Sequence, residues 1–203
     1  NSGHDVHKLT ASLIYGVEQE LVSPEMRRTA KTLNFGLMYG MGAFRLANEL
    51  KIPRKQAQEF ISSYFNVYSG VASFFDENVK KAEEAGFVET IMGRRRFIPG
   101  INSSNRVEKE AAIRIAKNTP VQGSAADIVK KAMIDVYEEL KKTNSQAKLL
   151  LQVHDELILE CPDSPNIIEE TVNLLTKCME NAVKLRVPLK VSVEYGKSWG
   201  EFH

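Results

Sequence analysis

The stretch RRTAKTLNFGLMYGMG, residues 27–42, carries cations and aromatic rings at helical spacing. Arg27, Lys31, Phe35 and Tyr39 are each four residues apart. Four residues advance about 400° on an α-helix, so these side chains form one slowly drifting stripe. The stripe begins with two cations and ends with two rings. A nucleoside triphosphate has the same polarity, so the pattern is suited to bind one. For such a stripe considered by itself, the alternative is an amphipathic helix whose cations are solvated and whose aromatic rings belong to the core.

Signals around this stretch predict a chain that is almost wholly helical up to about residue 120. Ser23-Pro24-Glu25 has the form of a helix start, with Ser as N-cap and Pro at the first helical position. Gly40-Met41-Gly42 ends that helix. Further helices are expected over residues 5–16, from Pro53 onward and over 71–85, with a small hairpin over 87–98.

The C-terminal part alternates between helices and strands. We expect a charged helix over residues 106–118 interrupted by Pro120, helices over 123–142 and 163–185, strands on both sides of His154-Asp155-Glu156, and a strand over 188–195. The predicted fold class is therefore α+β, with a small antiparallel sheet. We predict a helical subdomain over residues 1–122 and an α+β layer over residues 123–203.

Two further patterns carry polar side chains suited to nucleic-acid chemistry. Arg114, Asn118 and Gln122 are again four apart and can reach bases and sugars in a groove, although Pro120 breaks the predicted helix between them. An ordinary polar helix end is the alternative for this set.

A third pattern is the segment LLLQVHDELILE, residues 149–160. It predicts a tight hairpin with Asp155 at its tip. A carboxylate on so rigid a support offers the hard oxygen ligands that Mg²⁺ prefers. An acidic turn without function is the alternative.

Composition excludes some classes of protein and leaves others open. The formal net charge is +1, so the chain has no global basic field, but cations cluster at residues 27–31, 94–96 and 106–117. Cys161 and Cys178 show no metal-binding spacing and are predicted to be reduced thiols of a cytosolic protein. No apolar run reaches transmembrane length. The polar start without Met indicates a piece of a longer protein.

Taken together, these segments resemble family A DNA polymerases of the bacterial DNA polymerase I type. RRTAKTLNFGLMYGMG is similar to the nucleotide-binding helix of the fingers, called motif B, and LLLQVHDELILE is similar to motif C of the palm. Other matching segments are DVHKLTA, IPRKQAQEFI, GFVETIMGRRRFIPGI, NTPVQGSAADIVKKAMI and VPLKVSVEYGKSWGE. The resemblance covers essentially the whole chain and implies fingers over residues 1–122 and the C-terminal part of the palm over residues 123–203.

The resemblance also implies roles for residues of the first segment. Arg27 and Lys31 would hold the triphosphate of the incoming nucleotide, with His7 near its tail. Lys31 would also donate a proton to the leaving pyrophosphate. Phe35 would pack against the sugar and discriminate against dideoxynucleotides, and Tyr39 would sit beside the template base.

For the remaining residues the resemblance implies DNA and metal contacts. Arg114, Asn118 and Gln122 would line the minor groove near the primer terminus. Asp155 would bind two catalytic Mg²⁺ ions, Glu156 would be an accessory catalytic carboxylate, and His154 would lie near the primer end. The expected partners are primer–template DNA and deoxynucleoside triphosphates, for a monomer that works in DNA replication and repair in the bacterial cytoplasm.

One departure from the family pattern concerns the metal site. The family places a first metal-binding Asp on a palm strand just upstream of DVHKLTA, and this chain begins at Asn1, after that strand. We therefore expect the 203-residue chain to be inactive in primer extension by itself. The alternatives are a noncatalytic module that binds DNA or nucleotides, and a single-subunit RNA polymerase.

Overall fold

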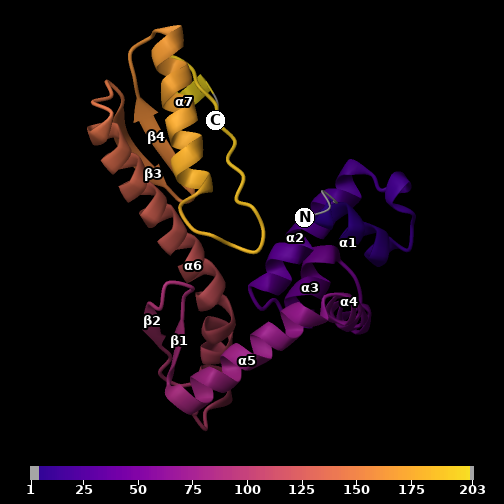
Figure 1. The fold of residues 1–203 in the computed structure, drawn as a ribbon. Coiled ribbons are helices and arrows are strands. Elements are labelled where there is room, and N and C mark those ends of the chain that lie inside the picture. Colours follow the sequence, from indigo (N-terminus) through magenta and orange to yellow (C-terminus); the bar gives the residue numbers. More distant parts are fainter. Residues whose placement is uncertain (1–4, 202–203) are drawn as a thin grey trace. The chain divides into compact units, whose positions relative to one another are not determined.

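The computed structural model describes residues 5–201 and has the predicted α+β class, with many helices and two small antiparallel hairpins (Figure 1). The chain divides into two compact units, one up to Gly123 and one from Ser124 onward. Among the helices that the structure describes, none has the length and apolar character that a bilayer crossing requires.

The first unit consists mainly of short helices. They are α1 (Val6–Tyr15), the 3₁₀ turn η1 (Gln19–Leu21), α2 (Pro24–Met38), α3 (Ala43–Leu50), α4 (Arg54–Val67) and α5 (Ser69–Ala85). Helix α2 starts where the sequence predicts, because the Ser23 hydroxyl accepts a hydrogen bond from the Met26 N–H at 3.2 Å and Pro24 occupies the first helical position.

Helix α3 was missed by the sequence analysis. Ala43, Leu46, Ala47 and Leu50 lie at i, i+3, i+4 and i+7, which is the apolar period of an amphipathic helix. The helix is short and lies close to the glycines that end α2, so the turn signal obscured the period. Its apolar face packs into one core cluster of the first unit, made up of Leu33, Ala43, Leu46, Ala47 and Ala57.

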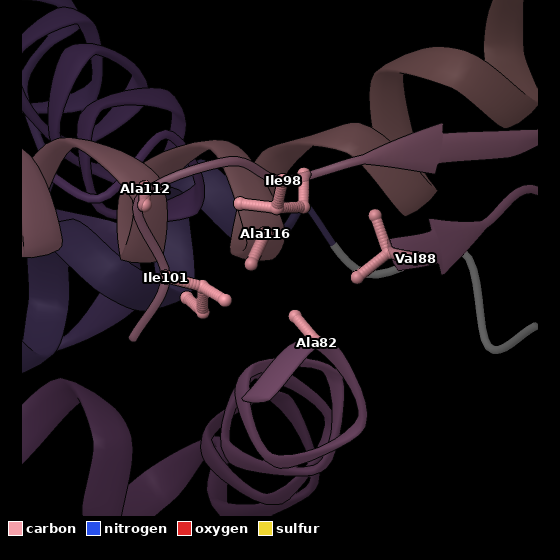
Figure 2. Close-up of a cluster of buried hydrophobic side chains, with 6 residues drawn as sticks. All are labelled: Ala82, Val88, Ile98, Ile101, Ala112 and Ala116. Carbon is pink, nitrogen blue, oxygen red and sulfur yellow. The ribbon is translucent and has the colours of Figure 1, made fainter. Parts of the chain in front are cut away.

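A predicted hairpin follows α5. Gly86 ends the helix in the left-handed conformation, with φ of 78°, which a residue without Cβ adopts readily. Strands β1 (Phe87–Glu89) and β2 (Arg95–Phe97) then pair antiparallel, with Val88 opposite Arg96. Figure 2 shows the cluster beneath them, which joins α5, the hairpin and the next helix and consists of Ala82, Val88, Ile98, Ile101, Ala112 and Ala116.

This cluster gives a first test of the fold. Ile98 has 2% of its surface exposed, whereas Ile91 in the same hairpin region has 55% exposed. We expect Ile98→Ala to lower the free energy of unfolding by about 2–5 kcal/mol, because it removes buried methyl groups and leaves a cavity. Ile91→Ala is the matched control and should change it by about 0.5 kcal/mol or less. Chemical denaturation measures both, and equal effects would contradict the assignment of the core.

Helix α6 (Arg106–Lys142) is continuous, so the predicted interruption at Pro120 is wrong. Proline has no N–H, and the carbonyl one turn earlier loses its helical donor. The hairpin stabilises this stretch from one side: the Arg96 guanidinium donates to the Thr119 hydroxyl at 3.2 Å, and that of Arg94 to the Gly123 carbonyl at 3.1 Å. Packing of α6 into core clusters before and after Pro120 offsets the remaining free-energy cost of the missing hydrogen bond.

The second unit contains the last part of α6, strands β3 (Lys148–Val153) and β4 (Glu156–Glu160), helix α7 (Pro165–Glu180) and the 3₁₀ turn η2 (Trp199–Glu201). The two strands pair antiparallel as predicted. Their core cluster consists of Val136, Leu140, Ala147 and Leu175. Cys161 and Cys178 pack against this cluster as free thiols.

Two expectations for this unit are wrong. Helix α7 ends at Glu180 rather than near residue 185, and residues 188–195 form no strand. Apolar and polar residues alternate there, but a strand also needs an edge to pair with. Within the described residues this segment instead directs the Val191 N–H to the Glu180 carboxylate at 3.2 Å, and Val193 packs against the core cluster.

Candidate functional site

The outer face of α2 presents the stripe of cations and rings to solvent. Arg27, Lys31, Phe35 and Tyr39 are all exposed, and the two rings have 45% and 46% of their surface accessible. The opposite face of the helix is buried. The rings of Phe35 and Tyr39 stack with centroids 6.4 Å apart and an interplanar angle of 20°. The stripe is therefore a continuous, accessible surface and not part of the core.

The cationic end of this surface is tied to the start of α1. Asp5 is the N-cap of α1, where one carboxylate oxygen accepts the N–H groups of His7 and Lys8 at 3.0 and 3.1 Å. The other oxygen accepts from Arg27 Nε at 2.6 Å. The hydrogen bond from Arg27 is the main reason why the pKa of Asp5 is below its usual value. Asp5 thus fixes the direction of the Arg27 guanidinium without burying it.

His7 lies beside the aromatic part of the stripe. Its ring is tilted at 48° to that of Phe35, with centroids 5.8 Å apart. Its Nδ1 lies 2.8 Å from the side-chain nitrogen of Asn34, which is buried on the inner side of α2. Burial lowers the pKa of His7, and the charges of Arg27 and Lys31 add to this effect while Asp5 opposes it. The environment therefore favours the neutral form of the His7 ring next to two cations.

Helix α6 contacts the aromatic end of the stripe. Asn118 Nδ2 donates to the backbone carbonyl of Tyr39 at 3.1 Å. At Gly40, where φ is 74°, an added Cβ would lie 3.3 Å from the side chain of Arg114, so glycine suits both the backbone conformation and the close approach of α6. Gln122 is exposed one turn further along α6.

The two predicted sets, the stripe of α2 and the residues on α6, therefore meet at Tyr39. Because α6 is unbroken at Pro120, Arg114, Asn118 and Gln122 follow one regular helical spacing, contrary to the expected break. The side-chain oxygen of Asn118 is buried and accepts no hydrogen bond within the described residues. This acceptor is therefore unused within that part of the chain.

The hairpin of β3 and β4 holds Asp155 at its tip. The ladder closes with Val153 opposite Glu156, so His154 and Asp155 form a two-residue turn. His154 has φ of 51°, in the left-handed region, and its carbonyl accepts from Gln152 Nε2 at 2.6 Å. His154, Asp155 and Glu156 are all exposed. The short turn on a paired ladder fixes the position of the carboxylate.

The surroundings of this tip suit a cation. The Asp155 carboxylate makes no hydrogen bond or ion pair with any described residue, so its oxygens are free to accept one. Asp155 and Glu156 line a cavity of about 450 Å³ together with Lys190 and Trp199. Within residues 5–201, no three His, Cys, Asp or Glu side chains converge on one point. The donor set fits a hard cation that takes further ligands from elsewhere.

Two buried polar residues behind the stripe of α2 were not predicted from the sequence. Asn34 and Thr10 are 6% and 1% exposed and connect α2 to α1 through a hydrogen bond of 3.0 Å. A signal was present for Asn34, because a polar residue stands between Leu33 and Leu37 on the apolar face of a helix. Such a position requires a buried hydrogen-bond partner.

Comparisons with known proteins agree with this arrangement. The family model described as DNA polymerase family A matches residues 1–201. The chain is 49% identical to DNA polymerase I of Treponema pallidum over 199 residues, which is 98% of this chain and 20% of that protein. It is 50% identical to DNA polymerase I of Geobacillus stearothermophilus over 197 residues, which is 97% of this chain and 22% of that protein.

A solved structure extends the similarity to the fold. It is the POL domain of Pol1 from M. smegmatis in complex with DNA primer-template and dNTP, with a TM-score of 0.92 and 44% identity over 98% of this chain and 35% of that chain. The chain spans about a fifth of the length of the curated relatives named above. The match over nearly its whole length, in sequence and in fold, shows that this chain belongs to DNA polymerase family A.

Proposed function

We propose that this chain is part of a DNA-directed DNA polymerase, which transfers nucleotidyl groups to a primer under the direction of a template. The observation that carries the proposal is the accessible stripe of cations and rings on α2, in a chain that the family model matches over residues 1–201. The similar structure from M. smegmatis was solved with primer-template DNA and dNTP, which supports the same ligands for this chain.

The stripe on α2 would bind the incoming deoxynucleoside triphosphate. Arg27 and Lys31 are exposed cations that can pair with phosphate oxygens, and the Arg27 guanidinium is already oriented by Asp5. Phe35 and Tyr39 offer ring faces to the sugar and base. Lys31 would also protonate the leaving pyrophosphate, and His7 would contact the end of the triphosphate.

The polar residues of α6 would bind DNA. Arg114 and Gln122 are exposed, and the buried side-chain oxygen of Asn118 has no donor within the described residues. Such side chains can hydrogen-bond to base edges and sugars in the minor groove. His154, exposed in the hairpin turn, would lie near the primer end. In this proposal residues 1–122 belong to the fingers and residues 123–203 to the palm.

Asp155 would be the metal-binding carboxylate and Glu156 an accessory one. When bound, two Mg²⁺ ions would stabilise the attacking and leaving oxygens of an in-line displacement. The contribution of this chain is an exposed carboxylate, fixed on a rigid turn and free of protein partners among the described residues. Further metal ligands would come from substrate phosphates and from other parts of the polymerase.

Primer extension by the full polymerase that contains this chain tests the proposal. We expect template-directed incorporation of deoxynucleotides that stops when EDTA removes divalent cations. Binding of DNA or dNTP without any extension would support a noncatalytic binding module instead. Efficient incorporation of ribonucleotides would support a single-subunit RNA polymerase.

Phe35 provides a test of substrate selection. We expect Phe35→Tyr to increase incorporation of dideoxynucleotides relative to deoxynucleotides by about tenfold or more, because the added hydroxyl replaces a hydrogen bond that the missing 3′-hydroxyl would make. The measurement is the ratio of the two kcat/KM values. Phe44→Tyr is a matched control, since Phe44 is 69% exposed and lies outside the stripe. An unchanged ratio in Phe35→Tyr would reject the contact with the sugar.

A further inference from the structure

A buried chain of hydrogen bonds leads from α1 through α2 to His7. Thr10 Oγ1 lies 3.0 Å from Asn34 Oδ1, and Asn34 Nδ2 lies 2.8 Å from His7 Nδ1. Thr10 and Asn34 are 1% and 6% exposed, so water does not compete for these contacts. The chain ends at a ring that lies against Phe35 in the stripe.

The order of donors and acceptors decides which ring nitrogen of His7 carries the proton. The Thr10 hydroxyl has one proton and lies near three oxygens: Asn34 Oδ1, the Val6 carbonyl at 2.8 Å and the Tyr68 hydroxyl at 3.4 Å, which can itself donate to Thr10. The Val6 carbonyl already accepts the backbone N–H one turn later in α1. Donation of the hydroxyl proton to the Asn34 oxygen, at 3.0 Å, leaves the NH₂ group of Asn34 facing His7 Nδ1 as a donor.

We propose that Asn34 is a positioning residue that holds His7 in the tautomer protonated at Nε2, and that Thr10 fixes the orientation of the Asn34 amide. An N–H donor at 2.8 Å requires a lone pair on Nδ1, so the ring proton of the neutral imidazole resides on Nε2. The proposal extends the function proposed above and depends on it only for the ligand of His7.

The charges around His7 indicate what this tautomer would contribute to phosphate binding. Arg27 and Lys31 on α2 and Asp5 at the start of α1 are the charged groups that act on the ring. A neutral ring with its proton on Nε2 adds a hydrogen-bond donor beside two cations, without adding a third positive charge to repel them. A triphosphate accepts hydrogen bonds at every non-bridging oxygen, and the opposite tautomer would present a lone pair to it.

The tautomer can be measured directly in the full polymerase that contains this chain, labelled with ¹⁵N-histidine. The His7 signals are identified by their loss in His7→Gln, and their ¹⁵N shifts show which nitrogen is protonated at a pH where the ring is neutral. We expect the proton on Nε2 in the parent protein and in Thr10→Ser, and a shift toward Nδ1 in Thr10→Val. A proton on Nδ1 of the parent protein would overturn the proposal.

Kinetics provide a second readout, one that loss of stability alone would not produce. In Asn34→Asp the carboxylate can only accept, so it holds an Nδ1–H and raises the pKa of His7. Nε2 then carries a proton only while the ring is cationic. We expect the KM for the templated dNTP in this variant to rise about tenfold as the pH passes upward through that pKa, with kcat little changed. The parent protein should lack this rise.

Different results would contradict the positioning role of Asn34 and the proposed polymerase function. If the parent protein shows the same pH-dependent rise as Asn34→Asp, the positioning role of Asn34 is wrong even though the enzyme is a polymerase. If the ¹⁵N shifts show Nε2–H but His7→Gln leaves the KM for dNTP unchanged, the tautomer is as proposed and the nucleotide contact of His7 is wrong. Absence of primer extension by the parent protein would reject the polymerase function itself.

Discussion

Replacing Asp155 by asparagine is expected to reduce primer extension by about 10³-fold or more. The substitution keeps the size and shape of the side chain and removes the negative charge that binds a divalent cation. A metal ion contributes several kcal/mol of transition-state stabilisation in such reactions, and each 1.36 kcal/mol corresponds to a factor of ten in rate. The measurement is single-turnover extension of a DNA primer by the full polymerase that contains this chain.

Asp163→Asn is the matched control for this substitution. Asp163 is also an exposed carboxylate and lies just beyond β4, outside the hairpin turn. The control should extend primers at nearly the parent rate, and DNA binding should be retained in both variants. If Asp155→Asn kept more than about a tenth of the parent rate, Asp155 would not be a ligand of the catalytic metal.

A second large effect is expected at Lys31. Replacing this residue by alanine removes an exposed cation from the middle of the stripe on α2 and, in the proposed mechanism, the proton donor to the leaving pyrophosphate. General acid catalysis contributes about 10²–10⁴-fold to a rate, so kcat should fall by this factor, and KM for dNTP should rise because a phosphate contact is lost. Pre-steady-state incorporation of a single nucleotide separates the two effects.

Arg28→Ala controls for the loss of a positive charge on the same helix. Arg28 is exposed and has no assigned role, and because it lies next to Arg27 in sequence its side chain projects about 100° away from that of Arg27. Its removal should leave kcat within about threefold of the parent value. A rise in the KM for dNTP in Lys31→Ala, with kcat unchanged, would show that Lys31 binds phosphate but does not donate the proton.

Much of the helical framework can be predicted from the sequence because its signals are local. Ser23 and Pro24 begin α2 by capping, and Gly86 ends α5 by its backbone conformation. The spacing of four residues from Arg27 to Tyr39 predicts a stripe, and the structure confirms that all its side chains are exposed. The hairpin that carries Asp155 is equally local, since two apolar runs and a short polar turn define it.

The errors concern features that depend on tertiary contacts. Pro120 is a helix breaker in isolation, yet α6 continues through it with hydrogen bonds from Arg94 and Arg96 and with packing on either side. Residues 188–195 alternate like a strand but pair with no strand among the described residues. In both cases the neighbouring element decides the outcome, and a local pattern contains no information about it.

The network behind His7 was missed for a related reason. His7 could be assigned through the family resemblance, but its partner Asn34 is 27 residues away in sequence and lies on the buried side of α2. Thr10 and Asn34 are ordinary helix residues until α1 and α2 are packed together. Only then does the Thr10 hydroxyl lie within hydrogen-bonding distance of the Asn34 amide, and that amide within hydrogen-bonding distance of His7 Nδ1.

The backbone at His154 brings a conformational demand and a proposed contact together at one residue. A side chain with a Cβ is strained at its φ of 51°, and glycine would adopt the same conformation freely. Glycine at this position would therefore make the protein more resistant to heat while removing an imidazole beside Asp155. A search for thermostable versions of this protein would favour that exchange, and, under the proposed function, a search for faster primer extension would discard it.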